Sequence, residues 1–410
     1  MRRKTAAAAS MLLCLVPSAA WAVDWSLRST ESETVALDSN MFLSPHPIGG
    51  TLGSYSTISA NAEARTPTSK FDVDSYVNYN KYFGPGASTL PDTENLAYGF
   101  KGHYETYGKN NSDRTYLDAG YNSSSAAFAL LNQLGVLTNV VGALNTLYFG
   151  GGIVRSLSAL DTVTLSANST QTSYDPPSAG TAFTDTSANA IWNHRLSSLT
   201  SLNASSNADF LEYNNGLSTK LTILHNQGGF DTNLTPLLSF HGMWGAAYVQ
   251  TQNGGIAPTS ASATGLIYDM LLTYKALKNT TFTVAAFQSV GPTAIGSLVE
   301  STAVRASVNH VINSVSSVTF SADEFQNTSP GTGQSQFASA SVSYSRALAK
   351  DWTAAITYRY LHSFGTTGGT TAALTPIVGG LPVISTLGAA SSNSLVVVIS
   401  KSSTLLAHTD

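Results

Sequence analysis

The sequence predicts an all-β fold: a single transmembrane antiparallel up-and-down β-barrel of about eighteen strands, with sixteen as the alternative. Apolar and polar residues alternate with a period of two over long stretches, which is the pattern of strands. Short polar turns recur at intervals of 35 to 47 residues, enough for a long hairpin and a loop. Only 11% of the residues are charged, against ~25% in soluble globular proteins. Together these observations favour a barrel over a soluble β-sandwich, whose strands are shorter.

The first 22 residues have the pattern of a secretory signal peptide. Basic residues at positions 2–4 precede an apolar run, and Ala20-Trp21-Ala22 has the small-x-small form of a cleavage site. The apolar run is shorter than the ~20 residues that a spanning helix needs. The only cysteine, Cys14, lies in this segment. We therefore expect an exported chain of one domain, residues 23–410, without disulfides or thiolate metal sites.

The charge of the exported chain argues against nucleic acid as a partner. Without the three basic residues of the signal peptide, 17 basic side chains remain against 24 acidic ones, a net charge of −7. Such an acidic chain is a poor general binder of nucleic acid.

Residues 338–361 show the strand pattern most clearly. The apolar face has Ala338, Ala340, Val342 and Tyr344, and serines occupy the odd positions between and after them. After the break RALAKD, the same face continues with Trp352, Ala354, Ile356, Tyr358 and Tyr360. A helix would mix the two faces, so this stretch is predicted to be a hairpin with one face in lipid and its serine face in a hydrated lumen.

Eight short turns divide the rest of the chain in the same way. They are expected near residues 67, 111, 158, 197, 232, 278, 314 and 349. A first strand at 26–36 and a last strand at 393–404 complete eighteen strands and place both ends on the periplasmic side. The longer external loops are expected at 38–53, 84–93, 132–145, 251–261 and 365–392.

Two details of this scheme concern aromatic residues and one irregular segment. Aromatic residues near strand ends are candidates for the interfacial girdles of such a barrel: Tyr82, Tyr107, Tyr148, Trp192, Trp352 and Tyr360. In residues 126–144, leucine and valine recur at helical spacing. That segment is either a loop helix or two strand ends around a turn.

No motif of an enzyme, a cofactor site or a metal site is present in the sequence. The chain has no GxSxG, HExxH or P-loop, and its eight histidines lack metal-ligand spacing. We therefore expect a protein that is not an enzyme and has no cofactor; an outer-membrane hydrolase assembled from distant Ser, His and Asp residues is the third-ranked alternative. The candidate functional residues are charged side chains whose strand parity points into the lumen: Glu63, Arg65, Asp72, Asp74, Lys101, His103, Glu105, Arg305, Asp323 and Arg359. They either set the selectivity of a pore or only stabilise the shape of the barrel.

The segment ALDSNMFLS (36–44) and the hairpin YSRALAKDWTAAITYRY resemble the β-barrel porin 2 group of Gram-negative outer-membrane proteins. The resemblance covers most of the exported chain and implies an outer-membrane location, insertion by the barrel-assembly machinery and, for some members, association with exopolysaccharide export. One departure is the end LLAHTD, where such barrels usually have a terminal aromatic residue. Either the last strand ends before a short tail, or assembly reads another signal.

The function that we expect is passive passage or export of small hydrophilic solutes or glycans through an outer-membrane pore. The alternatives are a closed structural or adhesin-type barrel that presents its loops to a partner, or a component of an exopolysaccharide export system. Lipid of the outer membrane is the expected surrounding, and the sequence leaves the oligomeric state and the solute open.

Overall fold

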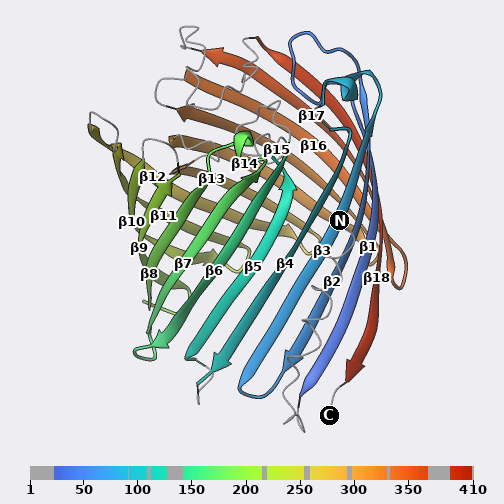
Figure 1. The fold of residues 1–410 in the computed structure, drawn as a ribbon. Coiled ribbons are helices and arrows are strands. Elements are labelled where there is room, and N and C mark those ends of the chain that lie inside the picture. Colours follow the sequence, from blue (N-terminus) through green and yellow to red (C-terminus); the bar gives the residue numbers. More distant parts are fainter. Residues whose placement is uncertain are drawn as a thin grey trace, which may run out of the picture.

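The computed structural model describes residues 23–408, except 91, 109–111, 127–141, 215–218, 254–258, 293–297, 330–332 and 368–387. Its described part is one sheet of eighteen strands that closes on itself into a barrel (Figure 1). Every strand pairs antiparallel with the next one in the chain. The predicted fold class and the count of eighteen strands are confirmed.

The strands follow one another in the order of the sequence. They are β1 (Asp24–Asp38), β2 (Thr51–Arg65), β3 (Ser69–Phe83), β4 (Glu94–Tyr107), β5 (Arg114–Ser125), β6 (Ala143–Ser156), β7 (Asp161–Asp175), β8 (Phe183–Arg195) and β9 (Thr200–Tyr213). The second half has β10 (Lys220–Thr235), β11 (Leu238–Asn253), β12 (Thr259–Leu277), β13 (Thr280–Pro292), β14 (Leu298–Asn313), β15 (Ser316–Ser329), β16 (Gly333–Ala349), β17 (Trp352–Thr367) and β18 (Ala390–His408). Two short 3₁₀ helices, η1 (Pro85–Thr89) and η2 (Pro177–Ala179), lie in loops.

Barrel closure is made by the first and last strands. Strand β1 pairs with β18 from Trp25 opposite His408 to Asp38 opposite Ser394, with one bulge after Leu27. Because β1 also pairs with β2, the sheet has no free edge at this seam. Backbone groups that would otherwise require water are therefore satisfied between strands, as a bilayer demands.

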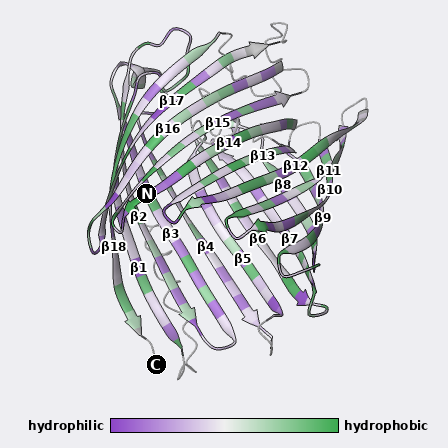
Figure 2. Ribbon diagram, turned by 180° about the vertical axis from the view of Figure 1, so that it is seen from behind, coloured by the Kyte–Doolittle hydropathy of each residue, from purple (hydrophilic) through white to green (hydrophobic). Residues whose placement is uncertain are grey.

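Hydrophobic and hydrophilic residues alternate along the strands, as the green and purple bands of Figure 2 show. Because successive side chains point to opposite faces, the two faces of the barrel wall differ in polarity. Large apolar side chains such as Val77 (49% exposed) and Phe100 (51% exposed) lie on one face. On the other face, side chains of strands that are not neighbours meet, as where Tyr76 of β3 hydrogen-bonds Asn122 of β5. Such meetings require a concave surface, so the polar face is the lumen.

The serine face of the hairpin at 338–361 lies on this inner side. Ser341 and Ser345 on β16 bond Ser321 and Ser317 on β15 through their hydroxyls, at 2.7 and 2.8 Å. The hydroxyl of Thr357 on β17 donates to that of Ser343 at 2.8 Å. Short hydroxyl side chains thus pair across strands, while Tyr358 and Ile356 remain exposed on the outer face.

The turns fall where the sequence predicts them, with one exception. Six of the predicted positions lie between consecutive strands, and a seventh, 349, is the last residue of β16, next to the reversal at 350–351. The turn expected near 232 is wrong, because β10 continues to Thr235 and the chain reverses at 236–237. Asp231 and Asn233, which resemble turn residues, are strand residues, and the Asp231 carboxylate accepts hydrogen bonds from Asn203 and His241 in the lumen.

The chain ends and longer loops differ modestly from expectation. Strand β1 begins two residues earlier than expected, and β18 runs to His408 instead of ending near 404. The loop at 84–93 lies between β3 and β4 as predicted, whereas the loop predicted at 38–53 is shorter, 39–50, because β1 runs to Asp38 and β2 begins at Thr51. The signal peptide, the segment 127–141 and the loop 368–387 lie outside the described residues, so the predicted cleavage and the loop helix remain predictions. Among the described helices, none is long and apolar enough to cross a membrane.

Three of the six predicted girdle aromatics are in the lumen instead. Tyr82 is 4% exposed and packs on Ala87 and Leu90 of the loop that contains η1. The hydroxyl of Tyr107 donates to Glu105 on the inner face, and Tyr148 approaches Gly120 there. Trp192, Trp352 and Tyr360 are exposed on the outer face. Aromatic identity alone does not decide the side of the wall; strand parity does.

The assignment of the two faces can be tested with neighbouring arginine substitutions. Val77→Arg places a charge on the outer face near the middle of β3 and should destabilise the barrel by about 2–4 kcal/mol, the cost of arginine near the bilayer midplane. Asn78→Arg, one residue on, points into the lumen and should cost much less. Urea unfolding in phospholipid vesicles measures both, and equal losses for the two variants would contradict the assignment.

Candidate functional site

The lumen is the candidate site, and the ten charged residues singled out from the sequence lie on its wall in two groups. Seven are on β2, β3 and β4 near the ends of these strands that meet the β2–β3 and β4–β5 turns: Glu63, Arg65, Asp72, Asp74, Lys101, His103 and Glu105. The other three lie on β14, β15 and β17: Arg305, Asp323 and Arg359. Their role in solute passage remains a prediction.

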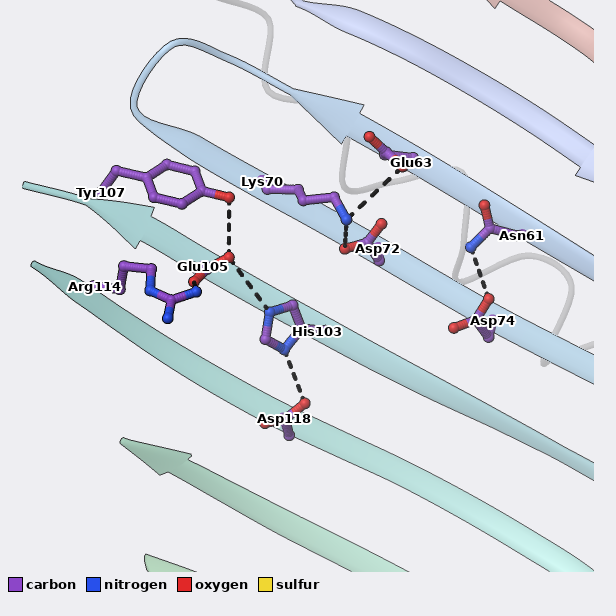
Figure 3. A network of polar contacts seen from close by, with 10 residues as sticks. All are labelled: Asn61, Glu63, Lys70, Asp72, Asp74, His103, Glu105, Tyr107, Arg114 and Asp118. Carbon is purple, nitrogen blue, oxygen red and sulfur yellow. Dashed lines mark hydrogen bonds and ion pairs between the residues drawn. The ribbon is translucent and has the colours of Figure 1, made fainter. Parts of the chain in front are cut away.

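Lys70 is the centre of the first group (Figure 3). Its ammonium lies 2.9 Å from Asp72 and 3.8 Å from Glu63. The next acidic side chain on β3, Asp74, accepts a hydrogen bond of 2.7 Å from Asn61 on β2. The carboxylate pair at 63 and 72 is therefore compensated by one cation, whereas Asp74 is held by a neutral amide.

A second chain of contacts continues from Glu105 across β4 and β5 (Figure 3). Glu105 accepts hydrogen bonds from the Tyr107 hydroxyl at 2.9 Å and from Arg114 at 3.3 Å. His103 lies between two acids, with Nδ1 2.9 Å from Asp118 and Nε2 4.0 Å from Glu105. Each side chain drawn in Figure 3 has a partner, so this part of the wall presents an ordered pattern of alternating charge to the lumen.

The second group does not form one cluster. Arg305 and Asp323, opposite each other on β14 and β15, form an ion pair at 3.4 Å. The Arg305 guanidinium also lies 5.4 Å from the centre of the Phe287 ring, within the range of a cation–π contact. Arg359 lines a separate cavity of about 360 Å³, together with Tyr55, Phe325 and Phe337.

The loop between β1 and β2 borders this cavity and narrows the lumen. Leu43, 4% exposed, packs against Phe337 and Ala390, with Phe325 and Leu361 around them. Its φ of 48° is unusual for a residue other than glycine and costs on the order of 1 kcal/mol. Contacts across the barrel seam therefore hold the loop in this conformation.

Asn40 makes those contacts. Its side-chain amide donates to the carbonyls of Ser44 at 2.8 Å and Ser391 at 3.1 Å, and its oxygen accepts from the Ser44 amide at 3.0 Å. Its backbone amide donates to Asp38 and to the Ser392 hydroxyl. This gives a physical reason for the segment ALDSNMFLS: its Asp and Asn fasten the loop to β18.

A second narrowing lies on the opposite side. Strand β13 pairs with β12 only up to Gln288, although its pairing with β14 continues to Pro292. The end of this hairpin leans inward, so that His225 on β10 bonds the carbonyl of Val290 at 3.1 Å. Val290 joins a buried apolar cluster on the inner wall: Leu211, Tyr213, Leu221, Ile223, Ala247, Val249 and Ile267.

Sequence reasoning missed several lumen residues that the same parity rule would have found. Lys70 has the same inward parity as Asp72 and Asp74 but lies at the start of β3. Arg114 and Asp118 have inward parity on β5, a strand with none of the ten predicted residues. The predicted set also lacks Asp185, Asp209 and His225. They lie on strands whose polar face has few charged residues. In the described part of the chain, no group of three or more His, Cys, Asp or Glu side chains could hold a metal ion.

Comparison with known proteins extends this picture at the level of the fold. No family model and no curated protein match the chain. Among solved structures, the FrpB iron transporter from Neisseria meningitidis (F5-1 variant, apoprotein form) is 8% identical, with a TM-score of 0.53 over 93% of this chain and 81% of that one. A BenF-like porin from Pseudomonas fluorescens Pf-5 is 9% identical, with a TM-score of 0.52 over 93% and 99%. The fold is that of outer-membrane β-barrels.

A third structure agrees with these two. Pseudomonas aeruginosa OpdQ is 10% identical, with a TM-score of 0.50 over 94% of this chain and 98% of that one. At such low identity the likeness is one of fold, not of substrate. The resemblance to the β-barrel porin 2 group remains a prediction.

The fastening of the β1–β2 loop generates one prediction. Asn40→Ala removes three side-chain hydrogen bonds, about 1 kcal/mol each, and should release the loop and raise single-channel conductance. Ser44→Ala is the matched control, because it removes only the hydroxyl contacts with His46. Planar-bilayer recording compares the two, and unchanged conductance in Asn40→Ala would show that the loop does not limit the pore.

The charge pattern around Lys70 generates another. Lys70→Met leaves Glu63 and Asp72 without their cation, so the permeability ratio of K⁺ to Cl⁻ should rise roughly twofold, since one charge in a wide aqueous lumen acts through a high dielectric. Lys81→Met is the control: it removes the same charge from the outer face, where Lys81 pairs with Glu94. Reversal potentials in a KCl gradient decide; an equal shift in both variants would contradict a lumen effect.

Proposed function

We propose that the protein is an outer-membrane channel for the passive passage of small hydrophilic solutes. The closed eighteen-strand wall with a polar inner face carries this proposal. An apolar outer face suits lipid, and an inner face of hydroxyl, amide and paired charged groups suits water and polar solutes. The likeness in fold to porins and to a transporter supports a role in transport.

The two narrowings support small solutes over long polymers. The β1–β2 loop and the inward end of the β13–β14 hairpin occupy the lumen from opposite sides. A solute must then be small enough to pass between the packed side chains of these two segments, as in a size-limited pore. Export of a glycan chain would need these segments to move aside, so it is the less favoured use of the same barrel.

The pairing of opposite charges in the lumen supports a channel with weak ion selectivity. Acidic and basic groups pair closely around Lys70, Glu105 and Arg305. Paired charges keep the wall hydrated while their fields largely cancel at a distance. We infer that neutral solutes such as small sugars pass together with ions.

Reconstitution tests this function directly. Protein extracted from outer-membrane fractions should show heat-modifiable gel migration, give stable conductance steps in planar bilayers, and admit pentoses and hexoses faster than trisaccharides in liposome swelling. Heat-inactivated protein at the same lipid ratio is the control. A barrel that migrates as folded but neither conducts nor admits sugars would overturn the channel and favour a structural or adhesin-type role.

A further inference from the structure

Two lumen carboxylates on β8 and β9 stand apart from the paired charges described above. Asp185 lies opposite Leu211 in the register, so Asp209 and Tyr213 flank it on the inner face of β9. The two acids are diagonal neighbours on adjacent strands, a spacing at which long side chains can reach each other. Asn207 donates to both oxygens of Asp209, at 3.0 and 3.1 Å. This amide holds Asp209 but supplies no positive charge.

Several oxygen atoms around this pair lack partners. Tyr213 is only 2% exposed and is the other diagonal neighbour of Asp185 across β8 and β9. Its hydroxyl has no hydrogen-bond partner in the described structure. One oxygen of Asp185 and the side-chain oxygen of Asn207 are also buried and unpaired there. Buried polar atoms are normally satisfied, because leaving them unpaired is costly. A group of oxygens without donors indicates a donor or cation from outside the chain.

The basic group at this place serves only one of the acids. His225 lies with Nδ1 3.7 Å from Asp209, and its Nε2 donates to the Val290 carbonyl at 3.1 Å. A carbonyl accepts only, so Nε2 must carry a proton. Asp185 forms no ion pair with any described residue within 4.0 Å. The cluster is therefore short of positive charge on the Asp185 side.

The remaining wall of the site is apolar and aromatic. The rings of Phe183 and Tyr213 lie 5.4 Å apart at 42°, and Leu211 and Ile223 join the buried cluster beneath them. Aromatic faces attract ammonium and guanidinium groups. A metal such as Ca²⁺ prefers six to eight oxygen ligands, and the described residues have no metal-binding group of three acids or histidines. The chemistry favours an organic cation over a metal.

We propose that Asp185, Asn207, Asp209 and Tyr213 form a binding site in the lumen for the ammonium group of a small organic cation, whose apolar part rests on the Phe183–Tyr213 side. As a step in permeation this rests on the proposed channel function, but binding itself does not. The two carboxylates supply the charge, the unpaired oxygens accept the ammonium hydrogens, and the aromatic pair selects cations with a short alkyl chain.

The test uses n-butylammonium as the probe, titrated by calorimetry into the full-length protein in detergent. Saturable binding is expected, and Asp185→Asn should weaken it roughly tenfold, as the loss of one charge-assisted contact does. Tyr213→Phe should weaken it by a smaller factor. Heat-modifiable migration confirms that each variant is folded.

Two variants with the same change in charge serve as controls. Asp74→Asn removes a carboxylate from another part of the lumen, and Glu324→Gln removes one that bonds Gln336 at 2.6 Å on the outer face. Both should bind butylammonium as the wild type does. If Asp74→Asn and Asp185→Asn weakened butylammonium binding equally, the effect would come from the total negative charge of the lumen, and the proposed site would be overturned. Binding of Ca²⁺ without binding of butylammonium would overturn its chemistry.

Channel recording separates this inference from the proposed function. In a conducting wild type, butylammonium should reduce the current, and the half-blocking concentration should rise roughly tenfold in Asp185→Asn. A protein that binds butylammonium but does not conduct would retain the site and overturn the channel. A conducting protein whose current and calorimetric signal ignore butylammonium would overturn the site alone.

Discussion

Closure of the sheet between β1 and β18 is the constraint on which the rest of the structure depends. A bilayer offers no water to unpaired backbone groups, so each strand needs a partner on both sides. The pairing of Trp25 with His408 and of Asp38 with Ser394 meets this need at the seam between the chain ends. Once the wall is closed, alternation of side chains assigns every second residue to lipid and the others to the lumen.

The side chains of the inner wall find their partners in three different ways around the barrel. On β15–β17, serine and threonine hydroxyls bond one another across strands. On β2–β5, acids and bases form chains through Lys70 and His103. On β9–β12 an apolar cluster lies on the inner face and is covered by the leaning end of β13. On the first two parts of the wall, polar side chains find hydrogen-bond or ion-pair partners on neighbouring strands. On the third part, the apolar side chains are covered by a segment that folds inward.

Strand periodicity could be predicted from the sequence because it depends on neighbouring residues only. The same rule points Arg305 and Asp323 into the lumen, where the strand register places them opposite each other and they form an ion pair. It failed where residue type was given more weight than parity: Asp231 and Asn233 were interpreted as a turn, and Tyr82, Tyr107 and Tyr148 as girdle residues. The Asp185–Asp209 pair could not be predicted as a site. The unpaired oxygens and the aromatic pair that indicate binding are brought together only in the folded wall.

The β1–β2 loop shows why the shape of the lumen is a late consequence of folding. Asn40 bonds Ser391 and Ser392, which are about 350 residues away along the chain. Those partners exist only after β18 has paired with β1, so an open sheet has no means to fix the loop. The strained backbone at Leu43 is held by Phe337 and Ala390, from β16 and β18. Narrowing of the lumen is therefore coupled to closure of the wall: the contacts that end the barrel also set its bore.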